Sequence, residues 1–369
     1  MKNMVFSLIQ KSDTFLVVEI SMQGARLTRI LADFVNRTIE VQQSRKVGFS
    51  DNLAVVLRRI DTLKSKIILI LDSDIGFTVY SKIPMHLPVG LSDESDFENI
   101  GMEALQKFFS SIRSEVANKL SIDSTEVALL DARFLGANLA TLTCVAQKWA
   151  EGIFKILPIN RVVMCVEGVA TFGRVVASSL NDKNFIFSHL SPNKTEVLSI
   201  EDMNISYLDY FSCGTETILD ELVLQIKFPK SLIKYVVNSY HRQLGSAIFL
   251  DKFGLSLSQE YKIIENGLRV IAGKSNLKSL CITSSETMPD FFTKIHIKNH
   301  AGHFMKIFTI SNSFIGEKLG FEVKYKIGAV DDNFQIALAG LWDFYLSPQS
   351  DAFLKIVKRK VRWINESVT

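Results

Sequence analysis

The sequence predicts a two-lobed α/β protein, and three observations support this prediction. A β-hairpin, a third strand and a helix follow one another near the start of the chain, and the same series returns about 170 residues later. The apolar run at 66–71 is typical of a strand buried on both faces of a sheet. The chain has 369 residues, a length that exceeds what one hydrophobic core usually serves, and 47% of the residues are hydrophobic.

The first copy of this series opens the chain. Alternating apolar and polar residues predict a hairpin and a third strand, and Ser50 and Asp51 are suitable caps for the helix after them. The expected elements are strands at 14–20, 25–31, 38–47 and 66–71 and a helix at 50–60. This order is an α/β beginning.

A small subdomain is expected to be inserted next, at 80–145. A polar, loop-rich stretch at 72–98 leads into it. An amphipathic helix at 101–120 and a strand at 125–131 would follow within it. A helix at 141–156, a strand at 161–166 and a helix at 169–180 would then close the first lobe.

The second copy of the series begins at residue 184. Its expected elements are strands at 184–188, 196–200, 206–211 and 279–283 and helices at 215–225, 230–244, 256–272 and 334–346. The predicted division of the chain is 1–79 and 146–183 for the first lobe, 80–145 for the insert, 184–346 for the second lobe, 347–350 for a linker and 351–369 for a tail.

Composition restricts the location and the partners. The net charge of +3 gives no strong field toward nucleic acid, so no nucleic-acid partner is expected. The apolar stretch at 5–9 is too short for a secretory signal, and no run reaches the ~18–20 apolar residues of a membrane span. Cys144, Cys165, Cys213 and Cys281 lie among apolar neighbours and are expected to be reduced core residues. We therefore expect a cytoplasmic protein.

Three turns come after predicted strands, at positions where a sheet could present its backbone to a ligand. The first is Glu19-Ile-Ser-Met-Gln-Gly24, the second is His189-Leu-Ser-Pro-Asn-Lys-Thr-Glu196, and the third is Thr283-Ser-Ser-Glu286. Gly214 lies just after the third strand of the second copy.

This duplicated plan resembles the actin/Hsp70/sugar-kinase superfamily over about residues 14–346, and the place of the insert matches the FtsA and PilM branches. The resemblance implies an actin-like (duplicated RNase H-like) fold with a nucleotide cleft. It implies cofactor-binding positions at Glu19, Gln23, Gly24, Lys194, Thr195, Glu196, Gly214, Ser284 and Ser285.

The turns depart from the pattern of that superfamily. Its first turn carries a small hydroxyl residue where this chain has Met22, and its second turn begins with an acid where this chain has His189. The glycines that let a backbone approach phosphate are absent from the second and third turns. We therefore expect no catalytic residue and no cofactor. Binding of ATP with Mg²⁺ is the alternative, and ordinary hairpin turns are the plainest interpretation.

The C-terminal segment predicts a membrane-binding amphipathic helix. Pro348 breaks the chain after the last core helix, and Asp351 can cap the next one. The apolar half would contain Phe353, Leu354, Ile356, Val357, Val361, Trp363 and Ile364. The basic residues are Lys355, Lys358, Arg359, Lys360 and Arg362, of which Lys360 alone interrupts the apolar face. Such a helix suits an anionic membrane surface, although a terminal helix docked on the protein's own core has the same periodicity.

These features support three functional hypotheses. The first is an FtsA-like scaffold without catalysis, peripheral on the cytoplasmic face of the membrane. The resemblance implies that it would tether a tubulin-like division protein or another membrane-associated assembly protein and could self-associate into filaments. The second is a PilM-like adaptor for the cytoplasmic tail of a membrane protein in pilus or secretion assembly, and the third is a weak actin-like ATPase. His296, His300 and His303 have metal-like spacing, but a strand–turn–strand is favoured there and no metal is expected.

Overall fold

The structure is a computed structural model, and it describes residues 13–48, 65–83, 94–135, 139–157, 161–180, 182–241, 243–284, 292, 295–310, 312–326 and 334–347. Contacts divide the chain into two compact units. Unit 1 comprises Met1–Ser179 and Ile315–Thr369, and unit 2 comprises Leu180–Phe314. The segments predicted as a helix at 50–60 and as the tail at 351–369 lie outside the described residues.

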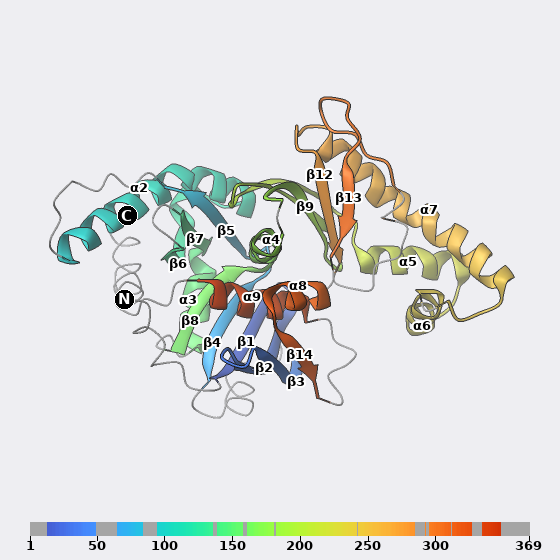
Figure 1. The fold of residues 1–369 in the computed structure, drawn as a ribbon, viewed down its shortest axis with the longest axis horizontal. Helices are drawn as coiled ribbons and strands as arrows, with labels where there is room; N and C mark the ends of the chain where they lie inside the picture. Colours follow the sequence, from blue (N-terminus) through green and yellow to red (C-terminus); the bar gives the residue numbers. More distant parts are fainter. Residues whose placement is uncertain are drawn as a thin grey trace. The chain divides into compact units, whose positions relative to one another are not determined.

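The main sheet of unit 1 has the strand order β14-β3-β2-β1-β4-β8 (Figure 1). Strands β1, β2 and β3 pair antiparallel, whereas β4 is parallel to β1 and β8 is parallel to β4. The strands are β1 (Asp13–Ser21), β2 (Gly24–Asp33), β3 (Thr38–Gly48), β4 (Lys66–Leu71), β8 (Val162–Glu167) and β14 (Glu322–Tyr325). The predicted hairpin, third strand and buried strand are confirmed.

The centre of this sheet is covered on both faces. Residues Phe15–Val18 of β1 and Ile67–Leu71 of β4 are at most 2% exposed, so neighbouring side chains on opposite faces are all buried. Helices α4 (Gly168–Ser179) and α9 (Gln335–Leu346) pack together, and α9 also contacts β1 and β4. A run of apolar residues without alternation is what such double coverage requires.

A second, antiparallel group of strands in unit 1 has the order β5-β7-β6. Its elements are β5 (Gly76–Lys82), β6 (Val127–Phe134), β7 (Leu139–Ala146), α2 (Glu94–Leu120), η2 (Ser124–Glu126) and α3 (Gln147–Ile156). Helix α2 packs on all three strands through residues that include Leu105, Phe109 and Val116 (Figure 1).

Two predictions for this region were wrong. The stretch at 72–98 was expected to be a loop but contains β5, whose seven residues pair with β7. The helix expected at 141–156 begins only at Gln147, because Thr141–Ala146 belongs to β7. Threonine and valine favour an extended backbone, and the pairing of β7 with both neighbours decides the matter.

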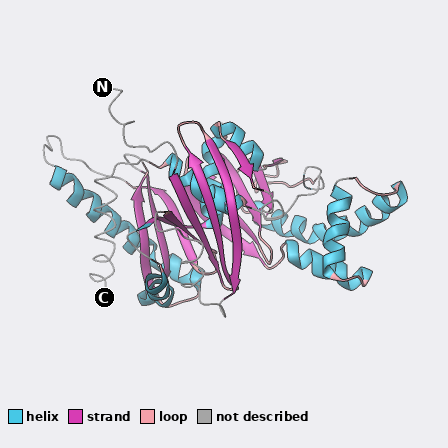
Figure 2. Cartoon of the chain, turned by 90° about the horizontal axis from the view of Figure 1, so that it is seen from below, coloured by secondary structure: helices cyan, strands magenta, loops and turns pink. Residues whose placement is uncertain are grey.

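Unit 2 repeats the topology of unit 1. Within this unit the strand order is β13-β12-β9-β10-β11, with β9, β10 and β11 antiparallel and with β12 parallel to both β9 and β13. The strands are β9 (Asn184–Leu190), β10 (Thr195–Glu201), β11 (Asn204–Phe211), β12 (Ser279–Ser284) and β13 (Lys306–Thr309). Helices α5 (Thr215–Ile226), α6 (Lys230–His241) and α7 (Ala247–Ala272) contact one another, and Figure 2 shows them in cyan.

Two sheets with the same internal order and the same pattern of antiparallel and parallel pairs define a duplicated α/β plan. The chain has the two-lobed actin-like (duplicated RNase H-like) fold that the sequence predicts.

The contact-based units differ from the predicted division at 315–346, which includes most of α8 (Asn312–Leu319), β14 and α9. These elements belong to unit 1. Gly340 explains the position of α9, because a Cβ there would lie 2.6 Å from Cδ1 of Ile70. The helix backbone therefore lies directly on β4. Among the described residues, no helix combines the length and the apolar character needed to cross a membrane.

Candidate functional site

The first turn lies between β1 and β2 of unit 1. Gly24 has a φ of +144°, and a Cβ there would be 2.3 Å from the carbonyl oxygen of Val47, so only glycine fits. The Gln23 N–H donates to Oγ of Ser21 over 3.3 Å, while Met22 is 58% exposed. Glu19 Oε2 lies 4.0 Å from Nε of Arg26, its cross-strand partner. The one carboxylate kept at this turn therefore has a guanidinium beside it.

The second turn, between β9 and β10, is closed by its own backbone and by helix α5. The Ser191 N–H donates to the Lys194 carbonyl over 2.9 Å. At the start of α5, the N–H of Thr215 donates to the Ser191 carbonyl at 3.1 Å, and that of Glu216 donates to the Pro192 carbonyl at 2.8 Å. Amide groups at a helix N-terminus are natural donors for an anion. Here the carbonyls of the turn occupy these two donors.

Gly214 makes this closure feasible. A Cβ at Gly214 would lie 2.2 Å from the Ser191 carbonyl oxygen and 2.5 Å from that of Pro192. The turn thus rests directly on the backbone before α5. The sequence singled out Gly214 as a position of the nucleotide cleft, and in the structure the absence of a side chain accommodates the chain's own carbonyls.

The other predicted residues of this turn point into unit 2. Thr195 Oγ1 donates to the Cys213 carbonyl over 2.7 Å. Lys194 Nζ lies 3.8 Å from Glu196 Oε1, and both side chains are largely buried. The Thr195 bond joins β10 to the segment that leads to α5, and the Lys194–Glu196 pair lies within the hairpin.

His189 begins the second turn. It is buried, and its Nδ1 lies 2.9 Å from Oγ1 of Thr283 on β12. The Thr283 hydroxyl also lies 3.2 Å from the Ser188 carbonyl oxygen, so it connects the imidazole with the backbone of β9. Burial lowers the pKa of His189 to about 4. The side chain is therefore neutral at pH 7. Ser284 is buried at the end of β12, and Ser285 lies outside the described residues.

The second turn does not offer the groups that a magnesium–nucleotide complex requires. A polyphosphate needs backbone N–H groups and a positioned divalent cation. In unit 2 two N–H groups at the start of α5 are engaged by carbonyls, and the buried imidazole of His189 is neutral. Within the described part of the chain, no three His, Cys, Asp or Glu side chains are grouped closely enough to hold a metal ion.

Glu167, at the end of β8, is a polar residue that the sequence analysis missed. Its Oε1 accepts the N–H of Val169 over 2.6 Å, and its Oε2 accepts the N–H of Ala170 over 2.8 Å. The carboxylate therefore caps the N-terminus of α4, where negative charge is favourable. An acid between an apolar strand and an apolar helix was the signal that could have identified it.

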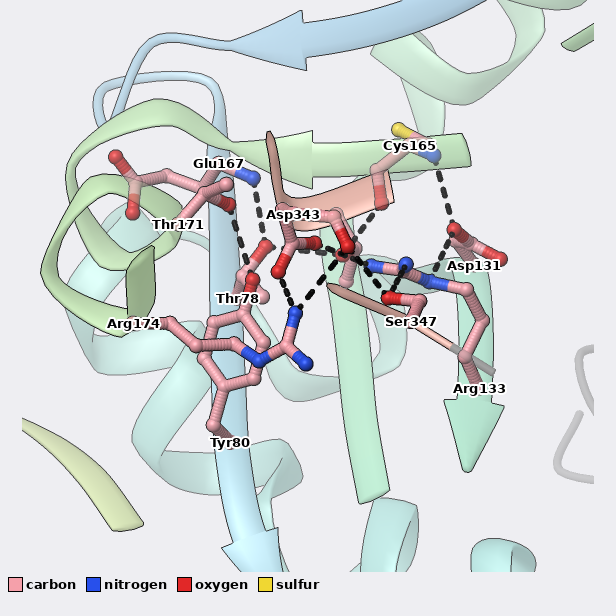
Figure 3. A network of polar contacts seen from close by, with 11 residues as sticks. Thr78, Tyr80, Asp131, Arg133, Cys165, Glu167, Thr171, Arg174, Asp343 and Ser347 are labelled. Carbon is pink, nitrogen blue, oxygen red and sulfur yellow. Dashed lines mark hydrogen bonds and ion pairs between the residues drawn. The ribbon is translucent and has the colours of Figure 1, made fainter. Parts of the chain in front are cut away.

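A buried ionic cluster in unit 1 was also missed (Figure 3). Asp343 of α9 lies between Arg133 of β6 and Arg174 of α4 and forms an ion pair with each, the Arg133 pair at 3.3 Å. Arg133 also pairs with Asp131 at 3.3 Å. The four side chains are almost fully buried, so the two positive and two negative charges compensate one another.

Ser347 ties the end of α9 to this cluster. Its Oγ donates to the Asp343 carbonyl over 2.7 Å and accepts from Nη1 of Arg133 over 3.2 Å. The guanidinium of Arg174 lies over the ring of Tyr80, 5.6 Å from its centroid, and Tyr80 Oη bonds to Thr171 at 3.0 Å. The cluster thus joins the predicted insert to helix α9.

The remaining candidates divide into confirmed and untested ones. The four cysteines are buried and form no disulfide, as predicted, and burial raises the pKa of Cys144 to about 12. His296, His300 and His303 are exposed on a loop whose arms meet in a bridge between Lys298 and Phe304. The predicted membrane-binding residues, from Phe353 to Ile364, lie outside the described residues.

Comparisons with known proteins gave similarities to solved structures only. No protein-family profile matches the chain. No curated protein matches it either. Among solved structures, it is similar to a PilM–PilN type IV pilus biogenesis complex at 12% identity, covering 96% of this chain and 97% of that one with a TM-score of 0.46.

Two other solved structures are similar over most of the chain. One is a Bacteroides thetaiotaomicron protein of unknown function with an actin-like ATPase fold, at 9% identity, covering 89% and 96% with a TM-score of 0.38. The other is the cytoplasmic domain of EpsL of the Vibrio cholerae type II secretion system, at 10% identity, covering 84% and 94% with a TM-score of 0.37. Identities this low concern the fold alone. The topology therefore assigns the class, an α/β protein of the actin-like fold.

Proposed function

We propose that this chain is an actin-fold scaffold that acts without phosphoryl transfer and attaches to the cytoplasmic face of a membrane through residues 351–369. The observation that carries the proposal is the closed second turn. Two N–H groups at the start of α5 donate to the Ser191 and Pro192 carbonyls, so the backbone that would cradle phosphate is satisfied within unit 2.

The loss of phosphate contacts is costly to catalysis because phosphoryl transfer depends almost entirely on positioning and electrostatic stabilisation. Opening the turn would expose two carbonyls and two amides that are now paired. The neutral His189 offers no negative charge for a magnesium ion. Such a site favours a scaffold role over an ATPase role.

The membrane half of the proposal is supported by the composition of the C-terminal segment. Five cations and no acid lie between Phe353 and Ile364, with seven apolar residues that share one half of a helix. Each basic side chain near an anionic surface contributes about 1 kcal/mol. The resemblance to FtsA favours a tubulin-like division protein, or another membrane-associated assembly protein, as the tethered partner. Self-association into filaments would strengthen attachment through avidity.

The structure supports a defined origin for this segment. Ser347 is buried and bonded to Arg133 and to the Asp343 carbonyl. The segment therefore leaves unit 1 from a fixed point, and only 348–350 separate that point from the predicted helix. A short tether of this kind would couple the body closely to the membrane.

Liposome co-sedimentation tests the proposal. The full chain is compared with a chain that ends at Ser350, which keeps α9, Ser347 and the buried cluster intact. We expect the full chain to pellet with vesicles containing phosphatidylserine. The shortened chain should bind these vesicles at least about tenfold more weakly. Neutral phosphatidylcholine vesicles serve as the control. Equal pelleting of the two proteins would refute attachment through the tail.

A PilM-like adaptor is the second candidate, and α7 carries a specific observation in its favour. Ile248, Leu255, Ile263 and Val270 are all more than half exposed and recur at seven- or eight-residue intervals along this helix. A row of this kind is suited to a segment of a partner protein, such as the cytoplasmic tail of a membrane protein. In cells, the adaptor would stay at the membrane without residues 353–369, whereas the scaffold would become soluble.

A further inference from the structure

A second basic surface lies in unit 2, on the loop between residues 295 and 306. In Figure 1 this loop, drawn in orange, lies beyond the end at which β13 begins. Ile295, Ile297 and Met305 are buried, whereas His296, Lys298 and Lys306 are exposed. The alternation therefore directs the basic side chains outward and fastens the loop to the core.

The loop is held in one shape by hydrogen bonds. Asn299 is buried, and its amide donates to the carbonyls of Asn276 and Leu277 at 3.2 and 3.3 Å while its Oδ1 accepts the His303 N–H at 2.9 Å. The His300 N–H donates to the Ser275 carbonyl over 2.8 Å. Gly302 supplies the left-handed turn at a φ of +79°. A preorganised loop presents its side chains at little cost in conformational entropy on binding.

Four side chains share the outer face of this loop. The bridge pairs Lys298 with Phe304, and the exposed His296 and Lys306 are each two residues further along the two arms. Lys298 Nζ lies 4.8 Å from the centroid of the Phe304 ring, and the His296 ring lies 6.0 Å from it. Phe304 is nevertheless 67% exposed. An apolar ring therefore stands in solvent among cations.

The charge within the loop itself has one sign, while Asp182, which accepts a hydrogen bond from Ser279 next to Lys306, is an acid at its edge. No aspartate or glutamate occurs anywhere between residues 291 and 316. Lys274 and Lys278 are also exposed on the adjoining segment, and of these Lys274 pairs with Asp209 at 3.2 Å. The loop and its neighbours thus form a basic surface whose complement is a surface of negative charge.

We infer that this loop is a second membrane contact, made by unit 2 with anionic lipid headgroups. Lysines on the outer face would lie at the headgroups while Phe304 enters the boundary with the acyl chains. An acidic protein segment would match the charge, but it gives no reason for an exposed phenyl ring at the centre of the cations. The inference extends the proposed membrane attachment and rests on residues of a different unit.

The test uses the full chain and four proteins: the parent, a loop variant, a tail variant and a control. The loop variant is Lys298→Glu, Phe304→Ser and Lys306→Glu, and the tail variant is Val357→Glu and Trp363→Glu. The control is Phe228→Ser, Lys252→Glu and Lys262→Glu, which makes the same changes of charge and polarity at exposed positions of the same unit. Partition is measured on vesicles of phosphatidylcholine with and without phosphatidylserine, at low and at high salt.

We expect the loop variant to partition about tenfold more weakly than the parent on anionic vesicles, with a smaller salt dependence, and the control to partition like the parent. A loop variant that partitions like the parent, or a control that loses as much, would overturn the inference. The inference would also be overturned if the loop variant lost binding to a polyglutamate peptide while its partition on vesicles stayed unchanged. That result would assign the loop to an acidic protein partner. If the tail variant alone partitions like the parent, the proposed function fails and the inference about the loop does not.

Discussion

His189 is a buried titratable side chain at the second turn. It lies against Thr283, where burial holds its pKa at about 4. A charged group at this depth would need compensating partners. The neutral ring bonds to the Thr283 hydroxyl and so contributes to the contact between β9 and β12.

The depressed pKa of His189 predicts a pH dependence of stability. Imidazole in the unfolded chain titrates near pH 6.5, so on acidification the unfolded state binds a proton that the folded state does not, until the pH approaches about 4. Stability therefore falls as the pH decreases through this window, by about 2 kcal/mol between pH 7 and pH 5 from this residue. His189→Gln should remove that part of the loss, measured by chemical denaturation at the two pH values.

Thr195→Val provides the control for this experiment. It removes the hydrogen bond to the Cys213 carbonyl in the same hairpin without changing a titrating group. The variant should lose about 1 kcal/mol at both pH values. A pH dependence of His189→Gln equal to that of the parent would contradict the assignment.

At the scale of elements, α9 is the helix that connects the C-terminal segment to the core of unit 1. Most of its residues are apolar, and Ala337 to Phe344 are buried. Asp343 is the one charged residue of this helix, and its counterions come from β6 and α4. The helix is thus tied by charge to two elements that lie about 170 to 210 residues earlier in the chain.

Replacing Asp343 with Asn tests this connection. Arg133 would keep Asp131, but Arg174 would lose its paired carboxylate inside the protein. We expect a loss of about 3–5 kcal/mol in the free energy of unfolding, because an uncompensated buried charge remains. Glu322→Gln, which breaks an exposed pair with Lys324 in the same unit, should cost at most about 1 kcal/mol. The free energy of unfolding of each variant is measured by denaturation monitored with tryptophan fluorescence. Similar losses in both variants would rule out a structural role for the cluster.

The elements also show where local sequence patterns are insufficient. The apolar run of β4 and the hairpins were readable because burial on one or both faces leaves a periodic trace. Strand β5 was missed because it comes directly after a polar turn and is followed by Pro84 and Pro88, which favour a loop. Strand β7 was read as helix because its composition is compatible with both, and only pairing with β5 and β6 selects the extended form.

At the scale of the whole molecule, the repeated strand order is the feature that defines the class. The two sheets repeat one topology, and the second turn is closed by hydrogen bonds to the start of α5. Fold and activity are separate properties in this class.

Nucleotide binding by the whole protein can be tested by thermal denaturation. A ligand at 100 times its dissociation constant stabilises a folded protein by about 2.7 kcal/mol. We expect the melting temperature in millimolar Mg-ATP to equal the melting temperature in magnesium alone. A magnesium-dependent increase that disappears in Glu19→Gln or Glu196→Gln would instead support the weak-ATPase hypothesis.

The sequence by itself determined the α/β class, the duplication, the residues of the three turns and the two-faced composition of the C-terminal segment, because each leaves a trace in residues that are neighbours along the chain. The tertiary structure decided that α5 donates its amides to the second turn, that His189 is buried, and that Arg133 and Arg174 meet at Asp343. These contacts join residues that are distant in sequence. Packing sets their geometry and their burial, and local periodicity carries no record of either.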